Sequence, residues 1–443
     1  MGMKRLDIAA RINLIFRSLR YRNYRLFFGG QSISLIGTWM QRIALPWMVY
    51  RMTGSAFMLG LVGFVGQIPT FILAPVAGVV TDRFHRYRVL IITQIVSMAQ
   101  ASVLAYLTLS GDIKLWHIIV LSIILGCVTA FDVPSRHSFV VDMVEKKEDL
   151  GNAIALNSMM FNGARLIGPS IAGVILAVSS EGICFLLNAI SFIFVIASLL
   201  MMKVDGKKKS ATKSGLFSDL KEGFLYAFGF APIKHIILLL ALVSLMGTSY
   251  QVLMPVYAKE VLKGGSEIFG FLMGAAGLGA FLAALYLASR ETVITLGRII
   301  PLATGIAGAA LTIISLEDLF FLTFFLMVFV GLGLMLHTVS SNTILQTITD
   351  DDKRGRIMSF YTMSIMGIAP FGSLIAGAMA KALGTRLTLL IGGISCLAGA
   401  YFFYRKLPLL KKIARPKYEK MGMIPEIVTG IQIASEPDLK TEE

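Results

Sequence analysis

The sequence has little charge, few cysteines and no motif for binding a nucleotide or a metal. Only 15% of its 443 residues are charged and 56% are apolar, more apolar surface than a water-soluble fold can bury. The three cysteines lie far apart in apolar segments, which argues against a disulfide framework or a zinc site. We also find no phosphate-binding glycine loop and no Ser-His-Asp arrangement, so we expect neither an enzyme nor a cofactor.

What the chain does contain is a series of apolar segments of about 20 residues, the length that crosses a bilayer as an α-helix. No cleavable signal segment precedes the first one, so we expect that segment to be the first membrane anchor. We therefore predict an all-α membrane protein with twelve transmembrane helices, at 26–50, 56–80, 89–109, 115–131, 152–178, 183–202, 233–258, 268–288, 299–316, 319–341, 357–380 and 383–404.

The net charge of +15 does not indicate a nucleic-acid partner, because the Lys and Arg residues flank the apolar segments. With twelve spans, the basic stretches all fall on one side, which the positive-inside rule assigns to the cytoplasm. The expected organisation is a basic amphipathic tail at 1–25, a six-helix bundle at 26–202, a central loop at 203–232, a second bundle at 233–404 and a mostly disordered tail at 405–443. Both tails and the central loop would be cytoplasmic, and the protein would lie in the inner membrane.

Two internal repeats relate the halves of the chain. The segment 34–38 with its following Gln41 recurs at 244–248 with Gln251, and Gly60 recurs as Gly270. The segment 151–173 resembles 355–377, so that Gly173 corresponds to Gly377. Span one therefore resembles span seven and span five resembles span eleven, the pattern of two bundles related by an axis along the membrane normal. A substrate site would then lie between the bundles near the midplane.

A compact basic loop follows the second span, with Gly78, Asp82, Arg83, Arg86 and Arg88 in close succession. Its composition and spacing resemble the loop between the second and third helices of major facilitator transporters, whose fold is two pseudo-symmetric six-helix bundles. Segments 37–41, 132–136, 152–158 and 165–173 further resemble the exporter branch of that superfamily that includes enterobactin exporters and macrolide efflux proteins.

The resemblance implies a cytoplasmic gate. In the family the basic loop clamps the ends of the two bundles, and its Asp faces the start of span eleven. The gating candidates are Gly78, Asp82, Arg83, Arg86, Asp132 and Arg136. Asp132 and Arg136 could pair with each other or with the loop, although Pro134 between them makes a regular helix doubtful. Asp132 is the leading candidate to carry a proton, with Asp82 as a second, and a structural ion pair is the alternative role.

Intramembrane arginines and polar stripes point to a cavity. Arg42 and Arg165 fall within spans, a costly depth for a cation, where they could meet an anionic ligand or instead fix helix packing. The polar residues near them would line the cavity or join helices by hydrogen bonds. The cavity candidates are Gln31, Ser34, Thr38, Gln41, Arg42, Arg165, Asn162, Thr248 and Gln251. A motif of Gly168, Pro169 and Gly173 resembles the span-five motif of antiporters and favours export.

These observations favour a secondary exporter, a proton-driven antiporter of amphipathic small molecules such as drugs or siderophores, working by alternating access. An importer, a symporter or a lysolipid flippase of the same fold is the alternative, and a non-transporting receptor is a third hypothesis. The expected partners are the bilayer, protons and an anionic or aromatic small molecule, and the expected state is a monomer.

Overall fold

A computed structural model describes residues 16–203 without Phe84, 224–290, Val293, 295–350 and 353–420. Within these ranges the side chains at 75, 78–83, 141, 147 and 420 are outside the description. The described residues form helices and no β-strand. Residues 1–15 of the tail predicted at 1–25, most of the central loop and the end of the last tail therefore lie outside the described residues.

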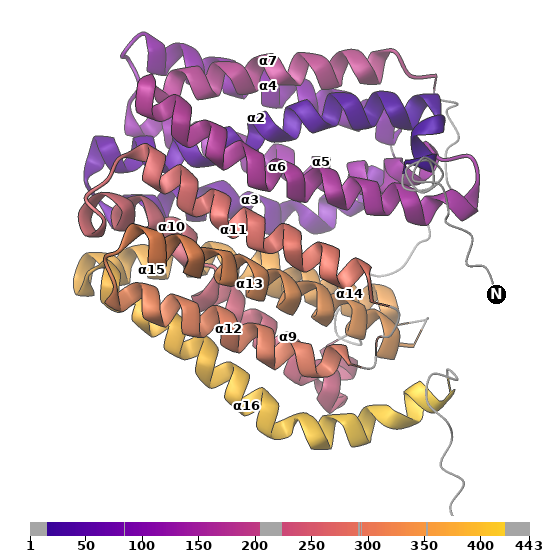
Figure 1. Cartoon of the computed structure of the whole chain (residues 1–443). Helices are drawn as coiled ribbons and strands as arrows, with labels where there is room; N and C mark the ends of the chain where they lie inside the picture. Colours follow the sequence, from indigo (N-terminus) through magenta and orange to yellow (C-terminus); the bar gives the residue numbers. More distant parts are fainter. Residues whose placement is uncertain are drawn as a thin grey trace, which may run out of the picture.

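Each half of the chain forms a bundle of long helices (Figure 1). The first bundle consists of α2 (Arg22–Thr53), α3 (Ala56–Arg83), α4 (Arg86–Leu109), α5 (Leu115–Asp142), α6 (Leu150–Val178) and α7 (Glu181–Leu200), with 3₁₀ turns η1 (Arg17–Arg20) and η2 (Lys147–Asp149). The second consists of α9 (Ala231–Leu242), α10 (Tyr250–Val256), α11 (Ser266–Ala288), α12 (Leu296–Leu316), α13 (Phe320–Ile348), α14 (Arg354–Thr362), α15 (Ala369–Leu383) and α16 (Thr385–Lys420).

Three π-helical turns interrupt spans of the second bundle. Turns η3 (Val243–Gly247) and η4 (Tyr257–Val261) flank α10 within the seventh span, and η5 (Met363–Gly367) joins α14 to α15 within the eleventh. Such turns are uncommon and are often found at functional sites. Here η3 and η5 lie at the middle of the membrane-spanning stretch and contact each other.

Eleven helical segments of the described chain are long and apolar enough to cross a membrane. The first predicted span, α2, is as long as the others but is not one of the eleven. Its 32 residues include Gln31, Ser34, Gln41 and Arg42, which lower its hydropathy. Because α2 packs along α6 and α7 inside the first bundle, it completes the predicted set of twelve spans. The polar content of this helix is therefore the first structural indication of function.

The last helix is longer than predicted. Residues 405–420, which the sequence analysis assigned to a mostly disordered tail, continue α16. Leu407, Leu410 and Ala414 are buried, so an apolar stripe at helical spacing holds this extension against the bundle.

The bundles meet along two helix pairs, α3 with α15 and α6 with α11. The helix α2 begins, and α16 ends, on the right of Figure 1, which we call the termini side, and the opposite end is the far side. The pairing follows the sequence repeat, because α3 and α11 are the second helices of their bundles and α6 and α15 belong to the fifth spans.

Candidate substrate site and gates

Two arginines of the first bundle lie close to the ring of Trp39. The guanidinium carbon of Arg42 lies 4.9 Å from the ring centroid and that of Arg165 lies 5.7 Å away, both cation–π distances. The side chain of Arg42 is exposed. Neither arginine forms an ion pair within the described chain.

The second bundle contributes Tyr250 of α10 to the same region. Tyr250 is only 1% exposed, and its hydroxyl lies near Arg165 and Gln251 without a hydrogen bond to any described residue. Gln251 is exposed. We call Trp39, Arg42, Arg165, Tyr250 and Gln251 the central cluster. It lies where the two bundles meet, since the backbone of Arg165 packs against Gly277 of α11.

Other cavity candidates lie inside the first bundle. Gln31, Ser34 and Gln41 are buried. The Gln41 amide donates to Gln100 of α4 at 3.1 Å and accepts a hydrogen bond from Asn188 of α7 at 2.7 Å. Gln41 thus takes the helix-joining role that the sequence left open beside cavity lining.

The remaining candidates make local hydrogen bonds. Thr38 donates to the carbonyl of Ser34 at 2.9 Å, and Thr248 donates to Ser244 at 2.7 Å; both are half-buried. The buried Asn162 amide donates to Ser158 at 2.9 Å, while its oxygen has no partner among the described residues.

Asp132 is the centre of a buried network between α4 and α5. Asp132 is only 7% exposed, and its carboxylate accepts hydrogen bonds from Gln94 at 2.7 Å and Thr93 at 3.2 Å. Arg136, four residues on, forms an ion pair with its other oxygen. The helix continues through Pro134, so the doubt about a regular helix here is resolved in favour of an internal pair.

The predicted cytoplasmic gate is described in part. Arg86 at the start of α4 pairs with Asp142 at the end of α5, at 3.3 Å, so it joins two helices of the same bundle. The side chains of Gly78, Asp82 and Arg83 lie outside the description. Their gating role stays a prediction.

Glycines allow the bundles to touch on the far half of the molecule. A Cβ on Gly173 would lie 2.9 Å from the Cα of Gly270, and one on Gly377 would lie 2.9 Å from the Cα of Gly60. The sequence repeat pairs Gly60 with Gly270 and Gly173 with Gly377, so the repeated glycines contact each other across the bundle boundary.

The antiporter-like motif forms part of this contact. A Cβ on Gly168 would lie 3.0 Å from the carbonyl oxygen of Ile36, so this glycine lets α6 approach α2 beside Trp39. Pro169 lies within α6, and its carbonyl would be 2.8 Å from a Cβ on Gly270. The motif thus joins the central cluster to the boundary with α11.

The far side is closed by contacts between the bundles. The Tyr50 hydroxyl donates to Glu260 of η4, and Lys259 lies 5.9 Å above the Tyr50 ring. Trp47 stacks on Phe269 of α11 with ring centroids 6.1 Å apart. The contact of Tyr50 with Glu260, which we call the latch, and the stacked rings of Trp47 and Phe269 therefore join the two bundles at this end.

On the termini side, a tyrosine before α2 contacts an aspartate before α6. The Tyr21 hydroxyl donates to Asp149 at 2.6 Å, and Arg17 and Arg20 pair with the same carboxylate. The hydrogen bond from Tyr21, with the charges of both arginines, holds the pKa of the Asp149 carboxyl below its ordinary value.

A matching arrangement holds the second bundle. Tyr226 donates to Asp350 at 2.8 Å, and Lys417 from the extension of α16 pairs with Asp350 at 2.7 Å. The hydrogen bonds from Lys417 and Tyr226 hold the pKa of Asp350 below its ordinary value. Both aspartates precede a fifth span, so the two tyrosine–aspartate contacts are a further element of the repeat, which the sequence analysis did not identify.

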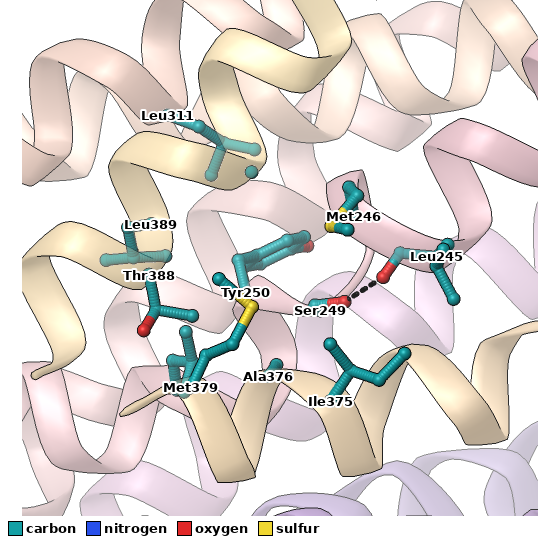
Figure 2. Close-up of a pocket in the computed structure, with 12 residues that line it drawn as sticks. Leu245, Met246, Ser249, Tyr250, Leu311, Ile375, Ala376, Met379, Thr388 and Leu389 are labelled. Carbon is teal, nitrogen blue, oxygen red and sulfur yellow. Dashed lines mark hydrogen bonds between the residues drawn. The ribbon is translucent and has the colours of Figure 1, made fainter. Parts of the chain in front are cut away.

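The enclosed pocket in Figure 2 lies within the second bundle between α10, α12, α15 and α16. Its volume of about 10 Å³ holds at most one water. Most of its lining is apolar, and Ser249 donates to the carbonyl of Leu245 (Figure 2). Tyr250 of the central cluster also lines this pocket, but the pocket is too small for a substrate.

The comparisons with known sequences decide the family. The profile of the family described as transmembrane secretion effector matches residues 15–427. The chain belongs to this family. The staphyloferrin A transporter of Staphylococcus aureus is 30% identical over 390 residues, 87% of this chain and 97% of that one. Macrolide efflux protein A of Streptococcus pyogenes is 23% identical over 407 residues, 86% and 96% of the two chains.

The fold agrees with this membership. A crystal structure of the peptide transporter POT superposes with a TM-score of 0.71 at 13% identity, and the match covers 88% of this chain and 95% of that one. Identity this low shows the fold alone. Together with the family match, it confirms the predicted fold, a major facilitator transporter of two six-helix bundles, as a multi-pass membrane protein.

One buried titratable residue of this secretion effector was missed by the sequence analysis. His337 of α13 is fully buried, its Nδ1 lies 2.9 Å from the Thr304 hydroxyl, and its Nε2 has no partner within the described chain. The sequence signal was a single histidine in the apolar run of the tenth span.

Proposed function

We propose that this transporter is a proton-driven secondary exporter of amphipathic small molecules that carry an anionic group, such as drugs or siderophores. The observation that carries the proposal is the pair of arginines, Arg42 and Arg165, which lie beside the Trp39 ring where the bundles meet and form no ion pair within the described chain. A cation within a membrane span is costly unless an opposite charge or water compensates it. An anionic substrate would supply that charge, and the Trp39 ring would pack on its apolar part.

Both bundles would hold the substrate. The buried Tyr250 hydroxyl lies beside Arg165 and would orient that guanidinium toward the substrate's anionic group, while the exposed Gln251 would contact the substrate. Binding at the boundary couples the substrate to the relative position of the bundles, which alternating access requires. The contacts of Tyr50 and of the paired glycines would open on the far side, while the predicted gate at Asp82 and Arg83 closes the termini side.

Asp132 would carry the proton. Its carboxylate holds Arg136, whose charge also acts on Arg42. Antiport requires the protonated state to be the substrate-free one, so Asp132 would be protonated, and its ion pair with Arg136 broken, while the anion site is empty. Deprotonation would restore the pair and accompany binding of the next substrate. The cytoplasmic location of both termini and a monomeric state belong to the same proposal.

Transport in inside-out membrane vesicles tests this function. An antiporter predicts alkalinisation of the lumen, followed with an internal pH dye, when a substrate from a panel of siderophores and macrolides is added under an imposed pH gradient. Asp132→Asn should abolish the pH response and keep substrate exchange, because exchange needs no net proton movement. No response to any compound, or an unchanged response in Asp132→Asn, would contradict the proposal. Acidification driven by substrate would favour a symporter.

A further inference from the structure

A groove runs along the outer face of the second bundle between α12 and α16. Its volume is about 1240 Å³, large enough for lipid acyl chains. The two helices lie side by side at the lower edge of Figure 1, where α16 bends. Pro408 lies inside α16 and lines the groove, so the bend has an identifiable cause.

The groove is apolar at one end and basic at the other. Leu302, Ile306 and Leu397 line it at membrane depth. Arg298 in the first turn of α12, with Arg405 and Lys411 late in α16, lines it toward the termini side. This separation matches an amphiphile that lies along the membrane normal with an anionic head at the interface.

None of the three cations forms an ion pair with an acidic residue within the described chain. Arg298 and Lys411 lie close enough for their charges to repel each other. Other cations of α16 behave differently: Arg386 pairs with Asp318, Arg415 with Glu419 and Lys417 with Asp350. The cations at the basic end of the groove are therefore left without such a pair.

Two tyrosines line the groove next to the cations. Tyr401 and Tyr404 are exposed, and the Arg405 guanidinium lies 5.9 Å from the Tyr401 ring. Aromatic side chains with a polar end favour the membrane–water interface. They mark the depth at which a lipid headgroup would lie.

We propose that this groove binds an anionic phospholipid, with its headgroup phosphate at Arg298, Arg405 and Lys411 and an acyl chain along α12. The apolar walls distinguish a lipid from free phosphate, because a free anion gains nothing from Leu302 or Ile306. The proposal is independent of the transported substrate, since the groove faces outward from the bundle and contains no residue of the central cluster.

Binding measured on the full-length protein in detergent micelles tests the site, with phosphatidylglycerol and phosphatidylcholine as probes and native mass spectrometry as the readout. Each basic side chain near an anionic lipid contributes about a fivefold gain in affinity. The triple variant R298Q/R405Q/K411Q should therefore lose about a hundredfold of its preference for phosphatidylglycerol. The control variant R22Q/R25Q/K412Q removes the same charge from exposed positions on the termini side, outside the groove, and should keep the preference.

Three results would overturn the proposal. One is a preference that survives the triple variant, and another is an equal loss in the control, which would indicate general attraction to the basic surface. The third is full competition by inorganic phosphate, which would indicate a site for a free anion. If the triple variant unfolds, the single variant Lys411→Gln with unchanged melting temperature should still lower the preference about fivefold.

Discussion

Replacement of Gly173 by alanine should open the far side of the transporter. The new Cβ would lie 2.9 Å from the Cα of Gly270 and 3.2 Å from the carbonyl oxygen of Glu267. Both are backbone atoms that cannot rotate away, so α6 and α11 must separate. Overpacking of this kind costs about 1–3 kcal/mol. Because the cost falls on the far-side-closed state, the ratio of closed to open molecules should fall by about 5- to 150-fold.

Distances between spin labels measure that shift. Ser110 and Leu319 are exposed on far-side loops of the two bundles and can carry the labels in a cysteine-free background. Gly163→Ala in the same helix is the matched control, because no atom lies within 4 Å of its new Cβ and its gain in helix propensity is the same. Gly173→Ala should lengthen the mean distance and the control should not. Identical distance distributions in the two variants would refute the reasoning.

Three further predictions test separate contacts. Tyr50→Phe removes the donor to Glu260, so it should shift the same label distances toward opening by about 1 kcal/mol, and an unchanged distribution would count against the latch. Gln41→Leu leaves the Asn188 amide without its acceptor, so it should lower stability by about 1–3 kcal/mol in thermal unfolding with no change in substrate preference. Tyr21→Phe removes the hydrogen bond that the Tyr21 hydroxyl donates to the Asp149 carboxylate. Because folding lowers the pKa of Asp149, its carboxylate stabilises the fold at pH values above the unfolded-state pKa. This stabilisation is lost as the pH falls through the folded-state pKa. The melting temperatures of wild type and Tyr21→Phe should therefore differ at neutral pH and converge in acid.

The membrane-spanning helices and the repeat could be predicted from the sequence because they depend on local composition. Apolar runs bounded by Lys and Arg define the spans, and the repeated glycines mark where backbones touch. The same signal underestimated the length of α16. Leu407, Leu410 and Ala414 continue the buried face of this helix, while its other face is charged. Charge density alone does not separate such an amphipathic extension from a disordered tail.

The candidate site was predicted only in part, because the role of a polar residue in a span depends on its partner. Gln41 and Arg42 are neighbours in sequence, yet Gln41 is buried and hydrogen-bonded to Asn188, whereas the side chain of Arg42 is exposed. The contact of Tyr50 with Glu260 joins residues 210 positions apart, and no local pattern announces such a contact. Sequence reasoning could name the polar residues of α2 but could not divide them between packing and binding.

The central claim is that Arg42 and Arg165 recognise an anionic group. The most direct measurement compares the affinities of a carboxylate-bearing substrate and its methyl ester for the purified transporter. A hydrogen bond to a charged group contributes about 1.5–3 kcal/mol, so Arg42→Gln or Arg165→Gln should weaken carboxylate binding at least about tenfold. Each variant should leave ester binding nearly unchanged, and Arg25→Gln, at an exposed position of the same helix, should change neither. Equal loss for acid and ester would contradict the account.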